Sequence, residues 1–441
     1  MGKKRKPLPT EPVAADIESL SHDGRGVCHV EGKAVFVPGA LPGEKVLFRY
    51  TRRARRHDEG VVEQVLTPAP ERVAPRCAHF GVCGGCALQH MDPAAQVHLK
   101  QGLLAEALAR IGKVEPLRWL PPLSGEPWGY RRKARLGVRF VAKKGRVLVG
   151  FRERGSAFVA DLARCDVLRP EMGERLPALA ALVESLSIRE RVAQIEVAQG
   201  DGPTVLIFRV LDPPTETDRA RLLAFAAETG LHVYLQPGGA DSVAPLPGQA
   251  VRLSYRLPAH GVEIGFEPFD FTQVNLELNR LMVDQALELL DPQPDERVLD
   301  LFCGLGNFTL PIARRAAAVV GVEGDAGLVL RARRNAEQNG IGNVDFQQAD
   351  LYGAPSAAAP WHQERFDKAL LDPPRTGARE VLDALAATSV RRIVYVSCYP
   401  ATLARDAAHL VHALGFRLVA AGAMDMFPHT AHLESMALLE R

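Results

Sequence analysis

Two residues near the C-terminus have the chemistry of a nucleophile and a proton acceptor. Cys398 follows the apolar run 392–397, which predicts a strand, and residues 427–434 contain two His and end in Glu434. A thiolate in a suitable environment is a strong nucleophile, and a carboxylate can remove a proton. The pair suits substitution at C5 of a pyrimidine, because thiolate addition at C6 makes C5 electron-rich and a base must then remove the C5 proton.

A second group of residues is typical of a site for a nucleoside-containing donor. Residues 300–311 begin with Asp300 at a predicted strand end and continue through a Gly-x-Gly turn into a predicted helix. Glu323 and Asp350 end the next two predicted strands, so all three acids should meet at one edge of a parallel sheet. A carboxylate at position 323 suits ribose hydroxyls. The turn lacks the third glycine of a dinucleotide fingerprint, which favours S-adenosylmethionine over NAD.

Residues 371–375, Leu-Asp-Pro-Pro-Arg, follow a further predicted strand. The two prolines stiffen the backbone after Asp372 and should hold this acid at the pocket floor. Similar runs occur in enzymes that methylate amino groups, so the run indicates methyl transfer without naming the methylated atom. Cys303 lies inside the glycine turn, and we expect it to pack in the core.

The spacing of four cysteines is typical of a metal site. Five residues separate one predicted ligand from a Cys-Gly-Gly-Cys run that contains two more, and the fourth lies about 80 residues later. Four thiolates fit an iron–sulfur cluster or zinc. A zinc ribbon normally has two Cys-x2-Cys pairs, and here the last cysteine has no such partner; free thiols remain a third possibility. The four candidates are Cys77, Cys83, Cys86 and Cys165, whereas Cys28 should pack in the N-terminal domain.

The 441-residue chain has a formal net charge of only +2, but its charge is unevenly distributed. Residues 1–154 contain 28 Lys and Arg against 15 Asp and Glu, and residues 155–441 contain 26 against 37. Two runs, 49–56 and 128–135, concentrate Arg beside aromatic residues, as RNA-binding surfaces do. No apolar run of about 18 residues predicts a membrane span, no secretory signal is recognisable, and seven Cys are too few for a disulfide framework.

The positions of these residues predict a multidomain protein. Residues 1–12 form a basic tail, and residues 13–70 contain short strands with glycine turns that predict a small β-barrel. Residues 75–268 alternate strand-like and helical runs, which predicts an α+β central domain with the four-cysteine cluster. Residues 269–441 alternate apolar strands with helices, as in a parallel Rossmann-like α/β sheet.

With these residues, the chain resembles the RNA uracil-C5 methyltransferase family over essentially its whole length. Residues 13–67 are similar to the family's TRAM domain, an OB-like RNA-binding barrel, and residues 271–275 match the segment that opens its S-adenosylmethionine-dependent methyltransferase domain. The resemblance implies Cys398 as nucleophile, Glu434 as proton acceptor and the four cysteines as [4Fe-4S] ligands. Tyr399 departs from the family's usual Asn. The implied donor contacts are Gln273, Phe302, Asn307, Glu323, Asp350 and Asp372.

The presence of both barrel and cluster favours the members that act on 23S rRNA, because tRNA-specific relatives generally lack both. The resemblance therefore implies methylation of a looped or single-stranded 23S rRNA uridine by a cytoplasmic monomer that contacts no membrane. Three alternatives remain at this stage: the same chemistry on another rRNA or tRNA uridine, methylation of an amino group through Asp372, or a non-catalytic RNA-binding or assembly protein.

Overall fold

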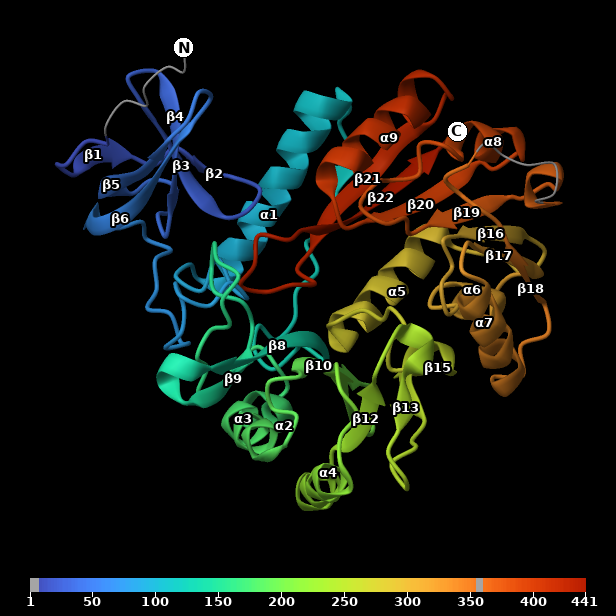
Figure 1. Ribbon diagram of the computed structural model, residues 1–441. Helices are drawn as coiled ribbons and strands as arrows, with labels where there is room; N and C mark the ends of the chain where they lie inside the picture. The colour runs from blue at the N-terminus through green and yellow to red at the C-terminus, as the bar shows by residue number, and fades with distance from the viewer. Residues whose placement is uncertain (1–7, 354–359) are drawn as a thin grey trace, which may run out of the picture.

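The computed structural model describes residues 8–353 and 360–441, and within these ranges three large sheets and one two-stranded sheet organise the chain (Figure 1). Residues 1–7 of the predicted basic tail lie outside the described residues. The predicted fold class is confirmed, with an N-terminal barrel, an α+β centre and a C-terminal α/β sheet.

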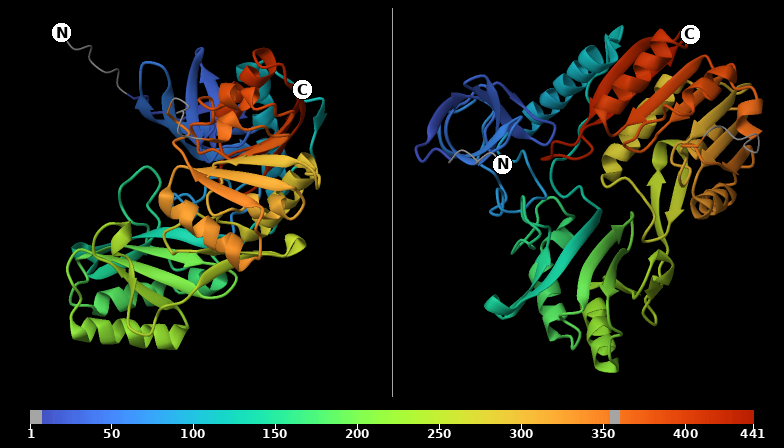
Figure 2. Two further views of the ribbon diagram at one scale, coloured as in Figure 1. Left: turned by 90° about the vertical axis from the view of Figure 1, so that its right-hand side faces the viewer. Right: turned by 45° about the horizontal axis from the view of Figure 1, so that its top comes forward.

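The N-terminal sheet has the strand order β1-β5-β6-β4-β3-β2 and curves into a ring (Figure 2, right). Alternate side chains point inward and form a core that includes Cys28 and Phe48, which confirms that Cys28 packs in the barrel. Gly60 allows this closure, since a Cβ there would lie 2.4 Å from the Phe48 ring. The strands are β1 Val13–Asp16, β2 Ser19–Leu20, β3 Arg25–Val30, β4 Lys33–Pro38, β5 Lys45–Arg53 and β6 Asp58–Thr67.

The central sheet has the order β13-β12-β11-β10-β8-β9, and its helices pack against one face (Figure 1). Helix α4 forms there at Glu216–Thr229, with Thr215 and Asp218 in a capping box. The strands are β8 Lys133–Val141, β9 Arg146–Gly150, β10 Val192–Gln199, β11 Thr204–Val210, β12 His232–Gln236 and β13 Ala244–Pro245, and the helices are α2 Pro170–Gly173, α3 Leu176–Ser185 and α4 Glu216–Thr229.

The C-terminal sheet has the order β18-β17-β16-β19-β20-β22-β21-β7. Its first five strands are parallel, and β22 returns antiparallel to both β20 and β21. The strands are β18 Val344–Gln348, β17 Ala318–Glu323, β16 Arg297–Leu301, β19 Lys368–Leu371, β20 Arg392–Ser397, β22 Glu434–Glu440, β21 Arg417–Met424 and β7 Arg118–Trp119.

Helices cover both faces of this sheet and form two separate cores. The first face carries α5 Leu276–Leu290, α6 Thr309–Ala313 and α7 Ala326–Gln338. The second carries α8 Leu382–Ala387, α9 Pro400–His412 and α1 Pro93–Ala107, which continues into a π-helical turn at Leu108–Gly112. This is the doubly wound arrangement expected for strands separated by helices.

Two segments of the predicted range 75–268, one with α1 and β7 and one with the hairpin of residues 253–266, pack with the C-terminal sheet instead of the central one. Helix α1 lies against α9 and β21, and β7 extends the sheet beside β21 (Figure 1). The hairpin β14 Leu253–Leu257 and β15 Val262–Phe266 packs on α7. Sequence order does not reveal such returns, and the domain boundaries themselves remain a prediction.

Candidate active site

Predicted site acids lie at the carboxyl edge of the C-terminal sheet, which we call the donor edge because the predicted contacts of the methyl donor lie there. Glu323 is the last residue of β17, Asp372 follows β19, and Asp350 lies two residues beyond β18. The Glu323 carboxylate accepts hydrogen bonds from the backbone N–H groups of Gly304 at 3.1 Å and Asp325 at 3.0 Å. This edge is where ligands bind in parallel α/β sheets.

The glycine turn between β16 and α6 has unusual backbone geometry. Phe302 has φ +65°, and Gly304 and Gly306 have φ values of +54° and +91°. Positive φ at three positions turns the chain sharply beside the sheet edge. Cys303 is 5% exposed and belongs to the core, as expected.

Asn307 is held by hydrogen bonds within the protein. Its Oδ1 accepts from the Tyr255 hydroxyl and from the Asn279 amide, both at 2.9 Å, and its own amide donates to Asn279 Oδ1 at 3.0 Å. These contacts fix the end of the glycine turn. Tyr255 and Asn279 carry no recognisable motif, so sequence analysis missed their role. Gln273 is half-buried in the segment between β15 and α5.

Asp300, the first of the three acids predicted at this edge, lies within β16 and is fully buried, so the prediction that it lines the edge is wrong and its role is structural. Its Oδ2 accepts a 2.5 Å hydrogen bond from the Thr309 hydroxyl. Burial raises the pKa of Asp300 to about 8, and the nearby acids Asp372 and Glu323 add to the shift. This carboxyl therefore tends to keep its proton at neutral pH.

The candidate nucleophile and base face each other across two antiparallel strands. Ser397 of β20 pairs with Ser435 of β22, so Cys398 and Glu434 occupy the next opposite positions. Glu434 is 2% exposed. Two residues far apart in the sequence are thus adjacent at the donor edge.

Burial dominates the electrostatics of this pair. It raises the pKa of Cys398 to about 11, with Glu434 and Asp372 adding to the shift and Arg375 opposing it. Burial, with Asp372 adding, also raises the pKa of Glu434 well above its usual range, and Arg375 again opposes. Burial raises the pKa of Asp372 to about 7. These shifts favour the protonated forms of the three groups, and a cation placed beside them would favour proton release.

The two His residues of the 427–434 segment have different surroundings. His429 is buried, stacks on Trp128 with ring centroids 3.9 Å apart, and its Nδ1 lies 3.2 Å from the Gln96 amide. His432 borders the cleft and accepts a hydrogen bond from Arg375 at 2.9 Å through Nδ1. His429 thus anchors the segment, whereas His432 orients a cation beside the nucleophile.

A cleft of about 700 Å³ opens beside Cys398. It is lined by His22 of the barrel, by Gly85 of the loop 77–90 (the cysteine loop), by Arg110 of the π-helical turn after α1, and by Tyr399 after β20. Four parts of the chain thus meet around the candidate nucleophile. This arrangement suits a large, extended ligand better than a small molecule.

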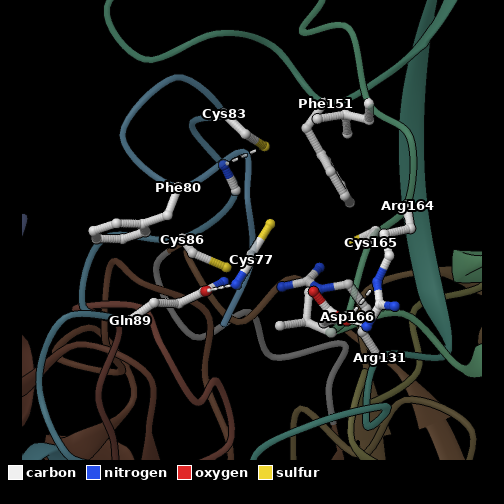
Figure 3. Close-up of a pocket in the computed structure, with 13 residues that line it drawn as sticks. Cys77, Phe80, Cys83, Cys86, Gln89, Arg131, Phe151, Arg164, Cys165 and Asp166 are labelled. Carbon is white, nitrogen blue, oxygen red and sulfur yellow. Dashed lines mark hydrogen bonds and ion pairs between the residues drawn. The ribbon is translucent and has the colours of Figure 1, made fainter. Parts of the chain in front are cut away.

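The four predicted metal ligands line one cavity of about 160 Å³ (Figure 3). Backbone bonds join the cysteine loop to the central domain, from Gly84 N–H to Arg152 O and from Arg154 N–H to Val82 O, both 2.8 Å. Gly173 lets Cys165 approach, since a Cβ there would lie 2.2 Å from the Cys165 carbonyl oxygen.

The donor set fits a cation within this cavity. Burial raises the pKa of Cys86 to about 12, and the other three cysteines add to the shift, so the thiols suit a bound positive centre. Among the described residues, no three His, Cys, Asp or Glu side chains converge on a single metal ion. The four thiol groups instead lie apart around the cavity. Gly85 and Arg131 line both this cavity and the cleft.

The two basic runs differ from each other in how far their side chains are exposed. In the run 128–135, Tyr130 is buried and its hydroxyl donates to Pro428 O, and Arg132 is buried and pairs with Glu277 at 2.6 Å. These two side chains therefore join parts of the chain and do not form an exposed RNA surface, whereas Arg131 of the same run lines the cleft.

The run 49–56 lies on the barrel surface. Arg49, Arg52 and Arg53 form ion pairs with the neighbouring acids of β6. Arg55 and Arg56 are exposed and have no ion pair among the residues that the structure describes. These two side chains are therefore the most available for phosphate.

Family models match three parts of the chain. Residues 11–47 match the TRAM domain, residues 292–391 a methyltransferase domain, and residues 360–441 tRNA (Uracil-5-)-methyltransferase. The last range contains Cys398, Tyr399 and Glu434. The matches thus include the first part of the barrel, Glu323, Asp350 and Asp372 at the sheet edge, and the candidate catalytic pair.

Similarity extends over whole chains. The chain is 59% identical over 442 residues to 23S rRNA (uracil(1939)-C(5))-methyltransferase RlmD from Alkalilimnicola ehrlichii, covering 100% of this chain and 99% of the relative. It is 57% identical over 439 residues to RlmD from Methylococcus capsulatus, covering 99% of each. The chain belongs to the RNA uracil-C5 methyltransferase family.

A solved structure supports the fold of this family member. Pyrococcus abyssi tRNA (uracil-54, C5)-methyltransferase in complex with S-adenosyl-L-homocysteine superposes with a TM-score of 0.74 at 24% identity, covering 97% of this chain and 99% of that one. In the described parts of the family member, no helix is long and apolar enough to cross a membrane.

Proposed function

We propose that this protein uses S-adenosylmethionine to methylate C5 of a uridine in 23S rRNA through a covalent adduct with Cys398. The observation that carries the proposal is the opposition of Cys398 and Glu434 across β20 and β22, at the donor edge and beside the cleft. The relatives named RlmD act on uridine 1939, and their identity with this chain supports the equivalent uridine as target.

The reaction assigns one role to each catalytic side chain. The Cys398 thiolate forms a bond to C6, and the C5=C6 electron pair moves toward C5 and the O4 enolate. C5 then forms a bond to the methyl group that S-adenosylmethionine supplies, while the bond from that methyl group to the sulfonium sulfur breaks and S-adenosylhomocysteine leaves. Glu434 removes the C5 proton, the C5=C6 bond reforms, and the C6–S bond breaks to release the thiolate.

Burial opposes ionisation of the catalytic side chains, and positive charge would favour it. When bound, S-adenosylmethionine supplies an electrophilic methyl group on a positive sulfonium. Burial raises the pKa values of Cys398, Glu434 and Asp372, and repulsion by nearby acids adds to the shifts of Cys398 and Glu434, so positive charge there favours the ionised forms. Arg375, which already opposes two of these shifts, is the protein's contribution to that charge.

The donor would lie along the carboxyl edge of the C-terminal sheet. We assign the ribose hydroxyls to Glu323, whose carboxylate is already oriented by two backbone N–H groups. The remaining residues would surround the adenine, the amino acid part and the sulfonium. They are Gln273, Phe302, Asn307, Asp350 and Asp372.

The cysteine cavity would hold a [4Fe-4S] cluster through Cys77, Cys83, Cys86 and Cys165. No step of the proposed reaction transfers an electron, so the cluster would have a structural role in joining the cysteine loop to the central domain. Iron and sulfide analysis under anaerobic conditions tests this. We expect Cys83→Ser to lose the cluster and Cys28→Ser, in the barrel core, to retain it; one zinc per chain would contradict the assignment.

The cleft and the exposed barrel arginines would bind a looped or single-stranded rRNA segment, because both are open to a polyanion. We propose that the protein acts as a cytoplasmic monomer, since the cleft is formed within one chain and rRNA is its substrate. A non-catalytic RNA-binding role would leave the arrangement of Cys398, Glu434 and the donor edge without use.

Trapping experiments test the reaction. RNA with 5-fluorouridine has no C5 proton to remove, so we expect it to form a stable adduct with the wild type and none with Cys398→Ala. With ordinary RNA, Glu434→Gln should accumulate a methylated adduct, because elimination needs the base. Glu440→Gln, at the far end of β22, is the matched control. A product with its methyl group on nitrogen would contradict the proposal.

A further inference from the structure

Tyr399 presents an aromatic ring in the cleft wall, directly after the nucleophile. The residue is 37% exposed and lines the cleft together with Cys398 and Arg375. The guanidinium carbon of Arg375 lies 5.9 Å from the centre of the Tyr399 ring. A cationic plane and an aromatic ring are thus neighbours where a nucleotide would approach the thiol.

The backbone of Tyr399 is firmly fixed. Its N–H donates to the Ser397 hydroxyl at 3.2 Å, and its carbonyl accepts from the hydroxyls of Ser397 and Thr402 at 3.1 and 3.0 Å. Pro400 follows as the first residue of α9. A ring on such a rigid support loses little entropy when a partner stacks on it.

Arg375 is oriented as well, through its 2.9 Å hydrogen bond to His432. The Tyr399 hydroxyl, by contrast, makes no hydrogen bond with the residues that the structure describes. The exposed face of the ring is therefore available to a partner that stacks on aromatic rings. The hydroxyl does not hold the Tyr399 ring in position.

We propose that Tyr399 and Arg375 form a platform on which an unpaired nucleobase next to the target uridine stacks. This inference rests on the proposed function. A uridine that reaches Cys398 must leave its own stack, which exposes the faces of its neighbours. Aromatic rings and guanidinium planes are the groups that stack on such bases.

Substitution of Tyr399 tests the platform in a single-turnover assay with a 23S rRNA stem-loop containing the target uridine. Tyr399→Leu should weaken RNA binding by roughly 5- to 150-fold, the range of one base–aromatic stack, with little change in the rate of the bound complex. Tyr399→Phe should stay within about twofold of the wild type, because the ring remains. Trp119→Leu, on β7 outside the cleft and 39% exposed, is the matched control.

A set of RNAs with one abasic nucleotide near the target identifies the stacked base. At that position the abasic change should weaken the wild type by the same factor as Tyr399→Leu, and the two changes together should cost no more than either one. Unchanged binding of S-adenosylhomocysteine by Tyr399→Leu shows that the variant is folded.

Two results would overturn the platform. One is that Tyr399→Leu binds RNA like the wild type; the other is that its loss is the same on every abasic RNA. If Tyr399→Leu does not fold, the wild-type abasic scan decides alone, and the absence of any sensitive neighbour refutes the proposal. A wild type that methylates no uridine would instead refute the proposed function.

Discussion

A buried ion pair between α1 and the segment before Glu434 provides a quantitative test of how the site is held. Lys100 Nζ lies 2.5 Å from Asp425 Oδ1 and also donates to Phe427 O at 3.0 Å. The side chains of Lys100 and Asp425 are 1% and 5% exposed. Residues 425–433 lead directly into the candidate base, so the pair links helix α1 to the catalytic strand β22.

The cost of breaking this pair follows from its distance and burial. At an effective dielectric constant of about 20, two unit charges 2.5 Å apart attract by about 7 kcal/mol. Much of this attraction offsets desolvation, and removing one partner of a buried pair typically costs about 3–5 kcal/mol. Lys100→Met should therefore destabilise residues 425–433 by about 3–5 kcal/mol, because the Asp425 carboxylate stays buried without its cation.

Hydrogen exchange of residues 425–433 measures this effect locally. Lys100→Met should speed exchange roughly 100- to 5,000-fold, as expected for a loss of about 3–5 kcal/mol, and methylation should fall in parallel. Lys100→Met combined with Asp425→Leu should recover much of the protection, since no charge is left buried. For comparison, Arg110→Met breaks the exposed pair with Glu106 and should cost less than about 0.5 kcal/mol. Unchanged exchange in Lys100→Met would refute this reasoning.

Three further outcomes are expected. Burial raises the pKa of Asp300 to about 8, so between about pH 4 and pH 8 the folded protein keeps a proton that the unfolded chain has released. The stability of the wild type should therefore fall as the pH rises from about 4 to about 8. Asp300→Asn should show a smaller fall in thermal midpoint over the same pH range. Tyr255→Phe removes the hydrogen bond to Asn307 and should weaken S-adenosylhomocysteine binding about 2- to 12-fold by calorimetry. Changing Arg55 and Arg56 together to Ser should make the slope of log affinity against log salt roughly 1.5 shallower; an unchanged slope would exclude them as phosphate contacts.

The sequence predicted well what depends on local order. Strand ends at Glu323, Asp372 and Cys398 could be located because apolar strands and helices alternate regularly in this region. The barrel strands and Cys28 in their core followed from alternation and glycine turns. Parallel topology then placed the strand ends at one edge without further information.

The same approach misjudged residues whose role depends on distant partners. Tyr130 and Arg132 occur in a basic aromatic run, yet they are buried against Pro428 and Glu277, which are more than 140 residues away. Composition predicts a charged surface but does not show which charges a neighbouring domain covers. Helix α1 is a similar case, since its position beside α9 depends on long-range packing.

The sequence by itself determined the chemical groups of this protein: a thiol, a base, donor-edge acids and four spaced cysteines. Their types and their positions at strand ends are local properties. Only the tertiary structure decided that Glu434 faces Cys398, that Arg375 and Tyr399 share the cleft, and that α1 anchors the catalytic segment. These arrangements depend on the antiparallel return of β22 and on burial, which sets charge and pKa through contacts between residues far apart in the chain.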